Sequence, residues 1–256
     1  MKNLIFGIVG CSGSGKSYIV NYVKNNFDLD VISILLQDNY YKRRKYQKKD
    51  CDGNYNFDLP SSFLEDELFD DLKKIKNNST VERLEYTFNN PKILPKKIIV
   101  KPRSIILVEG MFLFYYKNFQ KLIDRKIFID VDQNAGLKRR IKRDLEERGY
   151  DKNNVLYKYN NHVIPSYNKY ILPYKNDADL IVNNTKNDNE AAKLTLDYIK
   201  TEFQVLNNKF EDNQYRIYVN PEYNSEFGLN FDFSKPNIHF KNIEIKVINN
   251  NGGNKL

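Results

Sequence analysis

Near its N-terminus the chain reads Gly10-Cys11-Ser12-Gly13-Ser14-Gly15-Lys16-Ser17, directly after an apolar run at residues 4–9. The spacing fits G-x-x-x-x-G-K-[ST], in which glycines let successive backbone N–H groups turn inward around an anion. A helix expected at 16–26 adds the positive end of its dipole at the same point. One alternative is a glycine turn with an incidental lysine, but the apolar strand before the loop and the helix after it argue against this. Another is the dinucleotide-binding loop G-x-G-x-x-G, which the sequence does not match because Tyr18 occupies the position of the third glycine. The segment therefore predicts a phosphate-binding loop.

The phosphate loop implies a nucleotide and a metal. We expect all eight loop residues to bind ATP, with Lys16 at the β- and γ-phosphates and the Ser17 hydroxyl as a ligand of Mg²⁺. A second, acidic element is needed, and Glu109 supplies it directly after the apolar run 105–108. Ligands collect at the carboxyl ends of parallel strands, so Glu109 is expected to hold Mg²⁺ directly or through water. A glutamate that merely caps the strand is the alternative.

Composition narrows the class of protein. The 256 residues are 41% hydrophobic and 14% aromatic, which is enough for a packed core. No run approaches the ~20 apolar residues that span a bilayer, so we expect no membrane segment and no cleaved leader. Two cysteines, Cys11 and Cys51, are too few for a disulfide scaffold and fit a reducing, cytoplasmic location. The net charge of +8 is spread along the chain, which favours solvated faces and makes a nucleic-acid partner unlikely.

Strand-like and helical segments alternate, which is typical of an α/β fold with a mostly parallel sheet and helices on both faces. We expect strands at 4–9, 31–36, 105–108, 126–131 and 180–182, and helices at 16–26, 134–148, 153–170 and 189–206. Pro165 should interrupt the third of these helices. Ser62 and Glu65 resemble a capping box that opens another helix toward Lys76. Short strands at 81–88 and 98–100 flank a proline-broken turn and predict a small β-hairpin insertion.

The pattern changes near residue 207. We expect one domain over residues 1–207, followed by a C-terminal extension at 208–256 to which the sequence assigns no role. The Asn- and Gly-rich end of this extension, at 249–254, is expected to be disordered.

Further motifs decide between the reactions that a phosphate loop can serve. They are Gln37-Asp38-Asn39-Tyr40-Tyr41-Lys42, Asn56-Phe57-Asp58-Leu59-Pro60, Glu109-Gly110, RRIKRDLEERG at 139–149 and LPYKNDADLIV at 172–182. In order and spacing, these motifs resemble the uridine kinase (uridine–cytidine kinase) family over residues 3–183. The resemblance implies a three-layer P-loop fold with a lid helix, and ATP-dependent phosphorylation of a nucleoside 5′-hydroxyl, with uridine or cytidine as the acceptor. It also implies a homo-oligomer, often a tetramer.

The resemblance assigns roles to the acceptor side. Asp38 looks like the catalytic base, and a carboxylate at a strand end near the phosphate loop can orient a hydroxyl for in-line attack. Tyr41, Phe57, Asp58 and Tyr86 match family positions that contact the nucleoside, and Asp58 is suited to accept hydrogen bonds from two ribose hydroxyls. Phe57 as a core residue and Tyr86 as a strand aromatic remain alternatives.

The basic segment at 139–148 looks like the lid of the family. Arg139 and Arg143 share a helix face, and their guanidinium forks suit phosphoryl oxygens, with Arg139 on ATP and Arg143 in catalysis. In the family Arg140 lies near the sugar and its reacting end. A solvated basic helix, with Glu146 and Glu147 as ion-pair partners, is the alternative.

The base-reading positions depart from the family. Its hairpin His and Arg are Pro91 and Ile93 here, and the Arg and Gln after its lid are Tyr150 and Lys158. We therefore expect weaker discrimination among pyrimidines.

Two other functions stay open. Residues 108–114 also resemble the related nicotinamide riboside kinases, which would mean a different acceptor. A non-catalytic nucleic-acid-binding protein is the third possibility, because basic and aromatic residues interleave at 41–50. The basic members of that segment are Lys42, Arg43, Arg44, Lys45, Lys48 and Lys49.

Overall fold

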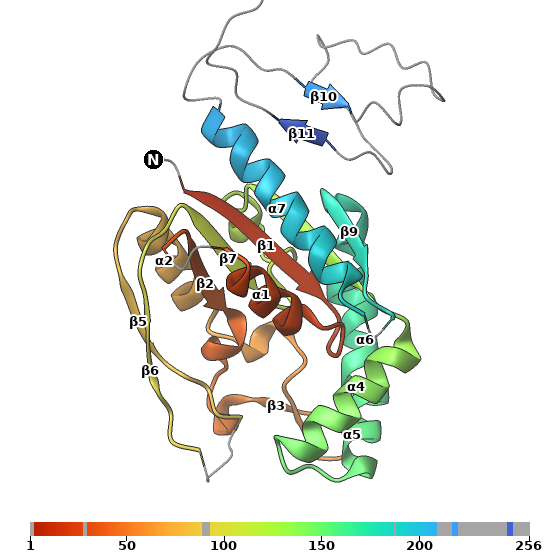
Figure 1. Cartoon of the computed structure of the whole chain (residues 1–256). Coiled ribbons are helices and arrows are strands. Elements are labelled where there is room, and N and C mark those ends of the chain that lie inside the picture. Colours follow the sequence, from red (N-terminus) through yellow and green to blue (C-terminus); the bar gives the residue numbers. More distant parts are fainter. Residues whose placement is uncertain are drawn as a thin grey trace, which may run out of the picture. The chain divides into compact units, whose positions relative to one another are not determined.

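A five-stranded parallel sheet forms the centre of the protein (Figure 1). The structure is a computed structural model that describes residues 3–27, 30–88, 93–186, 188–208, 217–219 and 245–247. The strands are β1 Leu4–Gly10, β2 Ile32–Leu36, β7 Ile105–Glu109, β8 Arg125–Asp130 and β9 Leu180–Asn183, in the order β2-β7-β1-β8-β9. The predicted strands are confirmed to within a residue or two at each end.

Helices cover both faces of this sheet, because its central strands are apolar on both sides. On β1, Ile5 and Val9 point into a core that also contains Leu72 of α2. Phe6 points to the opposite face, where its ring meets that of Tyr198 at 6.4 Å. Helix α1 and the start of α7 lie on this second face (Figure 1). The predicted three-layer α/β fold is confirmed.

The helices follow the expected order. They are α1 Lys16–Asn25, α2 Glu65–Lys76, α3 Lys117–Gln120, α4 Gln133–Glu146, α5 Lys152–Lys158, α6 Ile164–Ser166 and α7 Glu190–Asn208. The break expected at Pro165 is wrong. The chain stays helical from α5 to Ile171 because π-helical turns, Tyr159–Val163 and Tyr167–Ile171, flank the proline. An α-helix needs a backbone N–H at each residue to bond the carbonyl oxygen four residues back, and proline has none. The π turns on either side of it use a spacing of five residues instead, so the chain stays helical around the missing bond.

The start of α2 also differs from the prediction. The N-cap residue is Leu64, and no side chain caps the helix. Ser62 ends a short 3₁₀ turn, Pro60–Ser62, and its hydroxyl donates to the carbonyl oxygen of Asn56 at 3.1 Å. The capping box is therefore wrong, because the serine is already committed to the preceding loop. Glu65, Asp66 and Glu67 in the first turn still complement the helix dipole.

Two short strand pairs form separate two-stranded sheets in the first part of the chain. β5 Val81–Leu84 and β6 Lys97–Val100 form the predicted antiparallel hairpin, although β5 ends four residues earlier than expected. β3 Lys48–Lys49 pairs with β4 Tyr55–Asn56 in the loop before α2. Among the described residues, no helix is both long and apolar enough to cross a bilayer.

The chain divides into two compact units, residues 1–199 and 200–256. In the second unit, β10 Ile217–Val219 pairs antiparallel with β11 Ile245–Val247. The domain boundary at 207 stays a prediction, and the segment 249–254 lies outside the described residues.

Candidate active site

Three chain segments that carry the predicted chemistry leave the sheet at one edge. In the strand register Glu109 at the end of β7 lies beside Ile8 of β1 and Leu36 of β2. The phosphate loop begins two residues after Ile8, and Asp38 follows two residues after Leu36. Since parallel strands end at the same edge, the sheet brings the loop, Glu109 and Asp38 together.

The phosphate loop depends on glycine at two positions. Gly13 and Gly15 have φ angles of +83° and +87°, a region that other residues enter only with strain. A Cβ on Gly13 would lie 2.2 Å from the carbonyl oxygen of Gly136 on α4, and one on Gly15 would lie 2.3 Å from Asn184 Nδ2. Asn184 in turn donates from Nδ2 to the Ser14 carbonyl oxygen at 2.7 Å. The loop is thus held closely between α4 and the segment after β9.

A lysine, a serine and a glutamate meet at the end of this loop. Lys16 Nζ donates to the carbonyl oxygens of Gly10 and Cys11 at 3.0 and 3.1 Å and lies 3.9 Å from Glu109 Oε1. The Ser17 hydroxyl donates to Glu109 Oε2 at 3.3 Å. Burial raises the pKa of Glu109 to about 7 against the opposing effect of Lys16, and the neighbouring Asp38 raises it further. A hydroxyl and a carboxylate side by side form an oxygen donor set of the kind Mg²⁺ takes.

Asp38 is positioned by its neighbour in sequence. It lies in a short 3₁₀ turn, Gln37–Tyr40, and is half-buried. The Gln37 side chain is fully buried, and its Oε1 accepts hydrogen bonds from the backbone N–H groups of Met111 and Phe112 at 2.7 and 3.2 Å. A side chain on Gly110 would collide with Gln37. The turn that carries Asp38 is therefore fixed to the loop after Glu109.

A cavity of about 600 Å³ opens over this edge of the sheet. Most of the predicted site residues line it, namely Ser12, Gly13, Gly15, Lys16, Ser17, Asp38, Tyr41, Phe57, Asp58, Tyr86, Glu109, Arg139, Arg140 and Arg143. The other three loop residues, Gly10, Cys11 and Ser14, are buried and do not line the cavity. Burial raises the pKa of the Cys11 thiol to about 11. The structure thus brings the donor-side and the acceptor-side predictions into one space.

Aromatic rings form one wall of the cavity. The Tyr41 ring lies 5.0 Å from that of Tyr86, 6.0 Å from that of Phe57 and 6.1 Å from that of Phe88. Arg148 stacks over the Phe88 ring with its Cζ 3.7 Å from the centroid. Such a wall can hold a flat ring by stacking.

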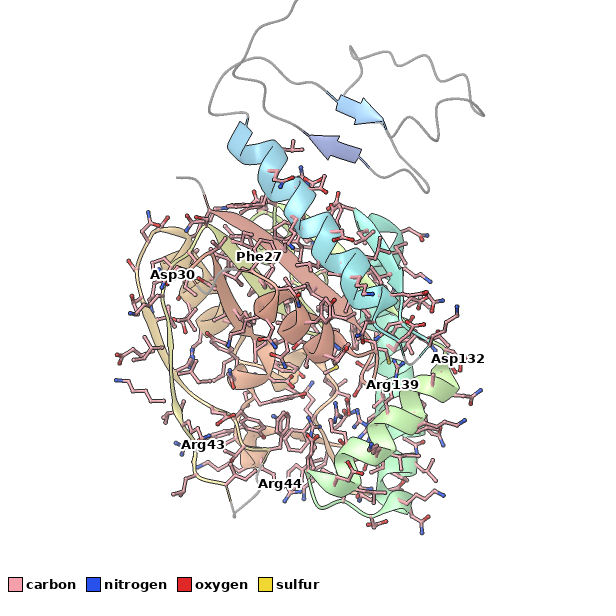
Figure 2. All side chains as sticks on the ribbon, viewed as in Figure 1. Phe27, Asp30, Arg43, Arg44, Asp132 and Arg139 are labelled. Carbon is pink, nitrogen blue, oxygen red and sulfur yellow. The ribbon has the colours of Figure 1, made fainter. Side chains whose placement is uncertain are left out.

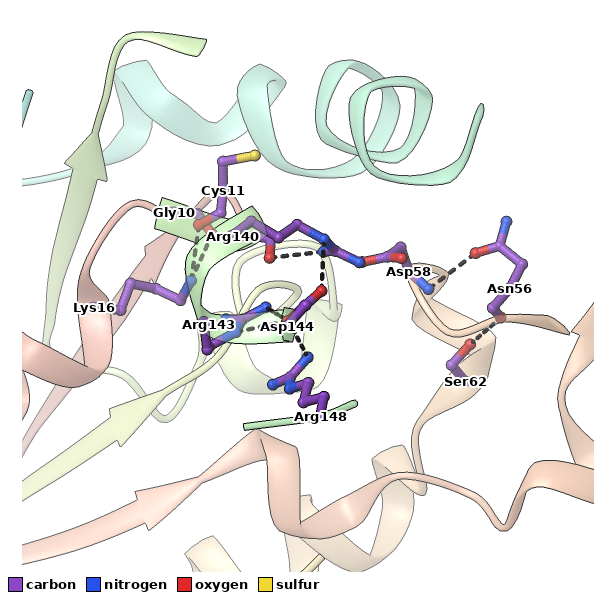
Figure 3. A network of polar contacts seen from close by, with 11 residues as sticks. Gly10, Cys11, Lys16, Asn56, Asp58, Ser62, Arg140, Arg143, Asp144 and Arg148 are labelled. Atoms are coloured by element: carbon purple, nitrogen blue, oxygen red, sulfur yellow. Dashed lines mark hydrogen bonds and ion pairs between the residues drawn. The ribbon is translucent and has the colours of Figure 1, made fainter. Parts of the chain in front are cut away.

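Arg140 joins the phosphate loop to the acceptor side (Figure 3). Its Nη1 donates to the Ser12 hydroxyl at 2.8 Å and to Asp58 Oδ1 at 3.2 Å. The arginine and Asp58 are both buried, and Asp58 together with Asp144 raises the pKa of Arg140 against the opposing effect of burial. One guanidinium thereby fixes the distance between a loop that can hold phosphates and a carboxylate that can hold hydroxyls.

A single carboxylate organises the arginines of α4. Asp144 is 2% exposed, and its oxygens lie 2.9 Å from Arg143 Nη2, 3.4 Å from Arg140 Nε and 3.5 Å from Arg148 Nη1 (Figure 3). Asp144 is thus a partner that the three arginines share, and the sequence interpretation did not single it out. A solvated face would leave it exposed, whereas here it is buried against the cavity.

Arg139 connects α4 to the segment that follows β9. Figure 2 labels this side chain at helix α4. Its guanidinium donates to the carbonyl oxygens of Asn184, Thr185 and Lys186 at 2.6, 3.3 and 3.1 Å, and it lines the cavity as well. A further cavity of about 570 Å³ lies beside Arg139, Tyr18 and this segment after β9. The arginine thus connects the lid helix to the segment that supports the phosphate loop.

The positions that depart from the family divide between two places. Tyr150 and Lys158 line the cavity, and Lys158 Nζ lies 4.1 Å from the centre of the Tyr150 ring. Burial and the nearby Arg140 lower the pKa of Lys158. Ile93 is 45% exposed and does not line the cavity, and Pro91 lies outside the described residues.

This fold and this site define the class of P-loop kinases, in which a phosphate loop and an acidic group at the ends of neighbouring strands face a lid rich in arginine. The model of the phosphoribulokinase / uridine kinase family matches residues 5–191. A uridine kinase of Staphylococcus haemolyticus is 33% identical over 205 residues, which covers 80% of this chain and 97% of that protein. One from Macrococcus caseolyticus is 35% identical over 158 residues, 62% of this chain and 77% of that protein. The chain belongs to the phosphoribulokinase / uridine kinase family.

Solved structures support the fold. A possible uridine kinase from Bacillus stearothermophilus has a TM-score of 0.51 at 17% identity and covers 71% of this chain and 89% of its own. Phosphoribulokinase from Rhodobacter spheroides has a TM-score of 0.53 at 16% identity, and the match covers 71% of this chain and 70% of that protein.

Proposed function

We propose that the chain transfers the γ-phosphate of ATP to the 5′-hydroxyl of a nucleoside, with uridine or cytidine as the acceptor. The observation that carries this proposal is the single cavity that contains the phosphate loop, Asp38 and Asp58. Relatives described as uridine kinases, which share a third of their residues with this chain, support the choice of acceptor. Kinases of this family phosphorylate a hydroxyl group. The cavity, at about 600 Å³, has the size of a site for a small-molecule acceptor.

The residues of the chain divide the reaction between them. Asp38 accepts the proton of the nucleoside 5′-hydroxyl. The oxygen of that hydroxyl forms the new bond to the γ-phosphorus of ATP, while the bond between this phosphorus and the leaving ADP oxygen breaks. Asp58 accepts hydrogen bonds from the ribose diol and thereby aims the hydroxyl. Lys16, Arg140 and Arg143 face the charge that moves between the oxygens. The rings of Tyr41, Phe57 and Tyr86 exclude water and hold the base.

Mg²⁺ belongs to the same proposal. When bound, the ion neutralises the phosphate oxygens and lowers the cost of charge build-up in the transfer. Ser17 and Glu109 would hold it, because their oxygens are adjacent and Glu109 is buried. Arg139 would meet the nucleotide from the lid side, where it lines the cavity.

A cytoplasmic location is also proposed. Both cysteines of the chain, Cys11 and Cys51, are free thiols, which fits a reducing compartment. The homo-oligomer implied by the family resemblance stays a prediction.

An acceptor screen tests the function. Purified full-length protein with MgATP is offered uridine, cytidine, adenosine and nicotinamide riboside in turn, and ADP release is coupled to NADH oxidation. We expect release above the acceptor-free rate with uridine and cytidine, and none from Lys16→Ala. Selective turnover of nicotinamide riboside would replace the proposed acceptor. No turnover with any nucleoside would refute nucleoside phosphorylation.

A further inference from the structure

One group of polar side chains outside the cavity joins two segments that are far apart in the sequence. The segment at residues 42–57, named here the acceptor loop, carries Asp50 at the end of its hairpin strand β3. The helical stretch that begins with α5 carries Tyr157 and His162. Among the residues that line the cavity, none belongs to this group of three.

Asp50 is the centre of the group. Its Oδ2 lies 2.6 Å from His162 Nε2 and accepts a hydrogen bond from the Tyr157 hydroxyl at 3.0 Å. Its Oδ1 accepts hydrogen bonds from the backbone N–H groups of Asp52 and Asn54 at 3.0 and 2.8 Å. One carboxylate therefore both shapes the tip of the acceptor loop and attaches it to the helical stretch.

The attachment is buried on the helical side. The His162 side chain is 1% exposed, and the Tyr157 and His162 rings meet edge to face with centroids 5.9 Å apart. The Tyr157 hydroxyl also lies within hydrogen-bond distance of Asp52 Oδ2, at 2.5 Å, so it reaches two carboxylates of the loop. Hydrogen bonds to charged groups are among the stronger ones in proteins.

The rest of the acceptor loop offers few other anchors. Of residues 43–54 only Gln47 is buried, and it bonds to the carbonyl oxygens of Lys42 and Ser62 near the base of the loop. The far end of the loop, in contrast, leads into the site. Tyr55, Phe57 and Asp58 line the cavity within eight residues of Asp50.

We propose that Asp50, Tyr157 and His162 are positioning residues that hold the acceptor loop against the lid side, so that Phe57 and Asp58 face the acceptor. This inference rests on the proposed function and names what keeps its acceptor site assembled. The helical stretch is tied to the lid helix by the Tyr159 hydroxyl, which donates to the Gln133 carbonyl oxygen at 2.9 Å. Asp50 thus forms a second attachment, in addition to the Asp58–Arg140 pair within the cavity.

The expected kinetic signature is specific. If the acceptor binds only when the loop is attached, its apparent affinity falls in proportion to the attached fraction. The side-chain contacts described for Asp50 go to Asp52, Asn54, Tyr157 and His162 and do not include the phosphate loop or Arg139, so the KM for ATP should not move. A purely structural role would instead lower thermal stability and the affinity for both substrates together.

The test compares three full-length variants by steady-state kinetics. We expect His162→Phe and Tyr157→Phe to raise the acceptor KM about tenfold, the effect of losing one hydrogen bond to a charged group, with the KM for ATP within about twofold. His162→Gln keeps an N–H donor at a similar reach and should restore most of the wild-type KM. Tyr46→Phe, in the same loop but 64% exposed, is the matched control and should match the wild type.

Several outcomes would overturn the inference. An unchanged acceptor KM in both phenylalanine variants, an equal loss for ATP and acceptor, or no rescue by His162→Gln would each do so. Tyr157→Phe removes a single hydroxyl and serves as the test if His162→Phe fails to fold.

A second readout separates this inference from the proposed function. Hydrogen exchange of the amides at 50–56 should be faster in His162→Phe than in the wild type, with the amides of β1 and β7 unchanged. If the wild type turns over no nucleoside, the proposed function fails. Faster exchange confined to 50–56 then still supports the attachment, and unchanged exchange overturns it.

Discussion

Replacing Asp144 by asparagine tests the charge arrangement of the lid. The change preserves shape but leaves Arg140, Arg143 and Arg148 facing one another without their shared carboxylate. Removing one partner of a buried ion pair costs about 3–5 kcal/mol, because the other charge stays buried and unpaired. The Arg140 and Asp144 side chains are 7% and 3% exposed, but Arg140 keeps its pair with Asp58, and Arg143 at 31% can turn toward water. We therefore expect a loss near the lower limit, about 3 kcal/mol.

Urea unfolding followed by circular dichroism measures this loss, and an exposed pair provides the control. Asp70→Asn removes the same charge from a pair with Lys73 whose side chains are 61% and 48% exposed. Such a surface pair is worth about 0.5 kcal/mol or less. A change below about 1 kcal/mol in Asp144→Asn, or one equal to that of Asp70→Asn, would refute the view that Asp144 organises the arginines.

Ligand rescue provides a second check on the same variant. Without Asp144, Arg143 and Arg148 lose the carboxylate that they share with Arg140, while Arg140 keeps its pair with Asp58. A polyphosphate bound over these arginines can supply the missing negative charge. Tripolyphosphate should therefore raise the midpoint of thermal unfolding more in Asp144→Asn than in the wild type. An equal shift in both proteins would mean that these arginines do not face the phosphate site.

Two further predictions concern the phosphate loop. Gly13→Ala should abolish ATP binding in a titration and destabilise the protein, because its Cβ would lie 2.2 Å from a backbone oxygen. The control is Gly53→Ala, at a residue that also has a positive φ of +80° but has no atom within 4 Å of a Cβ. This control should lower the free energy of unfolding by about 1–2 kcal/mol and leave the ATP affinity unchanged. Equal effects of the two substitutions would contradict the close packing of the loop against α4. Because burial raises the pKa of Cys11 to about 11, its alkylation should accelerate about tenfold per pH unit up to that value. At pH 8 iodoacetamide should label the exposed Cys51 alone, and fast labelling that persists in Cys51→Ser would contradict the burial.

The sequence predicted the sheet well for a physical reason. Strands buried on both faces appear as short apolar runs, and those at residues 4–9 and 105–108 became β1 and β7. Asp38 and Glu109 could be found because each follows such a run directly, and parallel strands end at one edge.

The remaining features depend on contacts that a local pattern does not contain. Ser62 precedes a helix in the way a capping residue does, but its hydroxyl is used by Asn56, which only the folded loop brings near. His162 meets Asp50 across 112 residues, and no motif connects them. Asp144 could have been found, because it stands four residues after Arg140 on a predicted helix.

The central claim is that the Asp38 carboxylate faces the acceptor hydroxyl while the phosphate loop holds ATP independently. The most direct test measures both properties in Asp38→Asn, with turnover from the coupled assay and ATP affinity from calorimetry. We expect kcat to fall by about 10²–10⁴, the usual contribution of a general base, with the Kd for ATP within about twofold of the wild type. Near wild-type turnover would contradict the claim, and so would a loss of ATP binding that accounts for the lost activity.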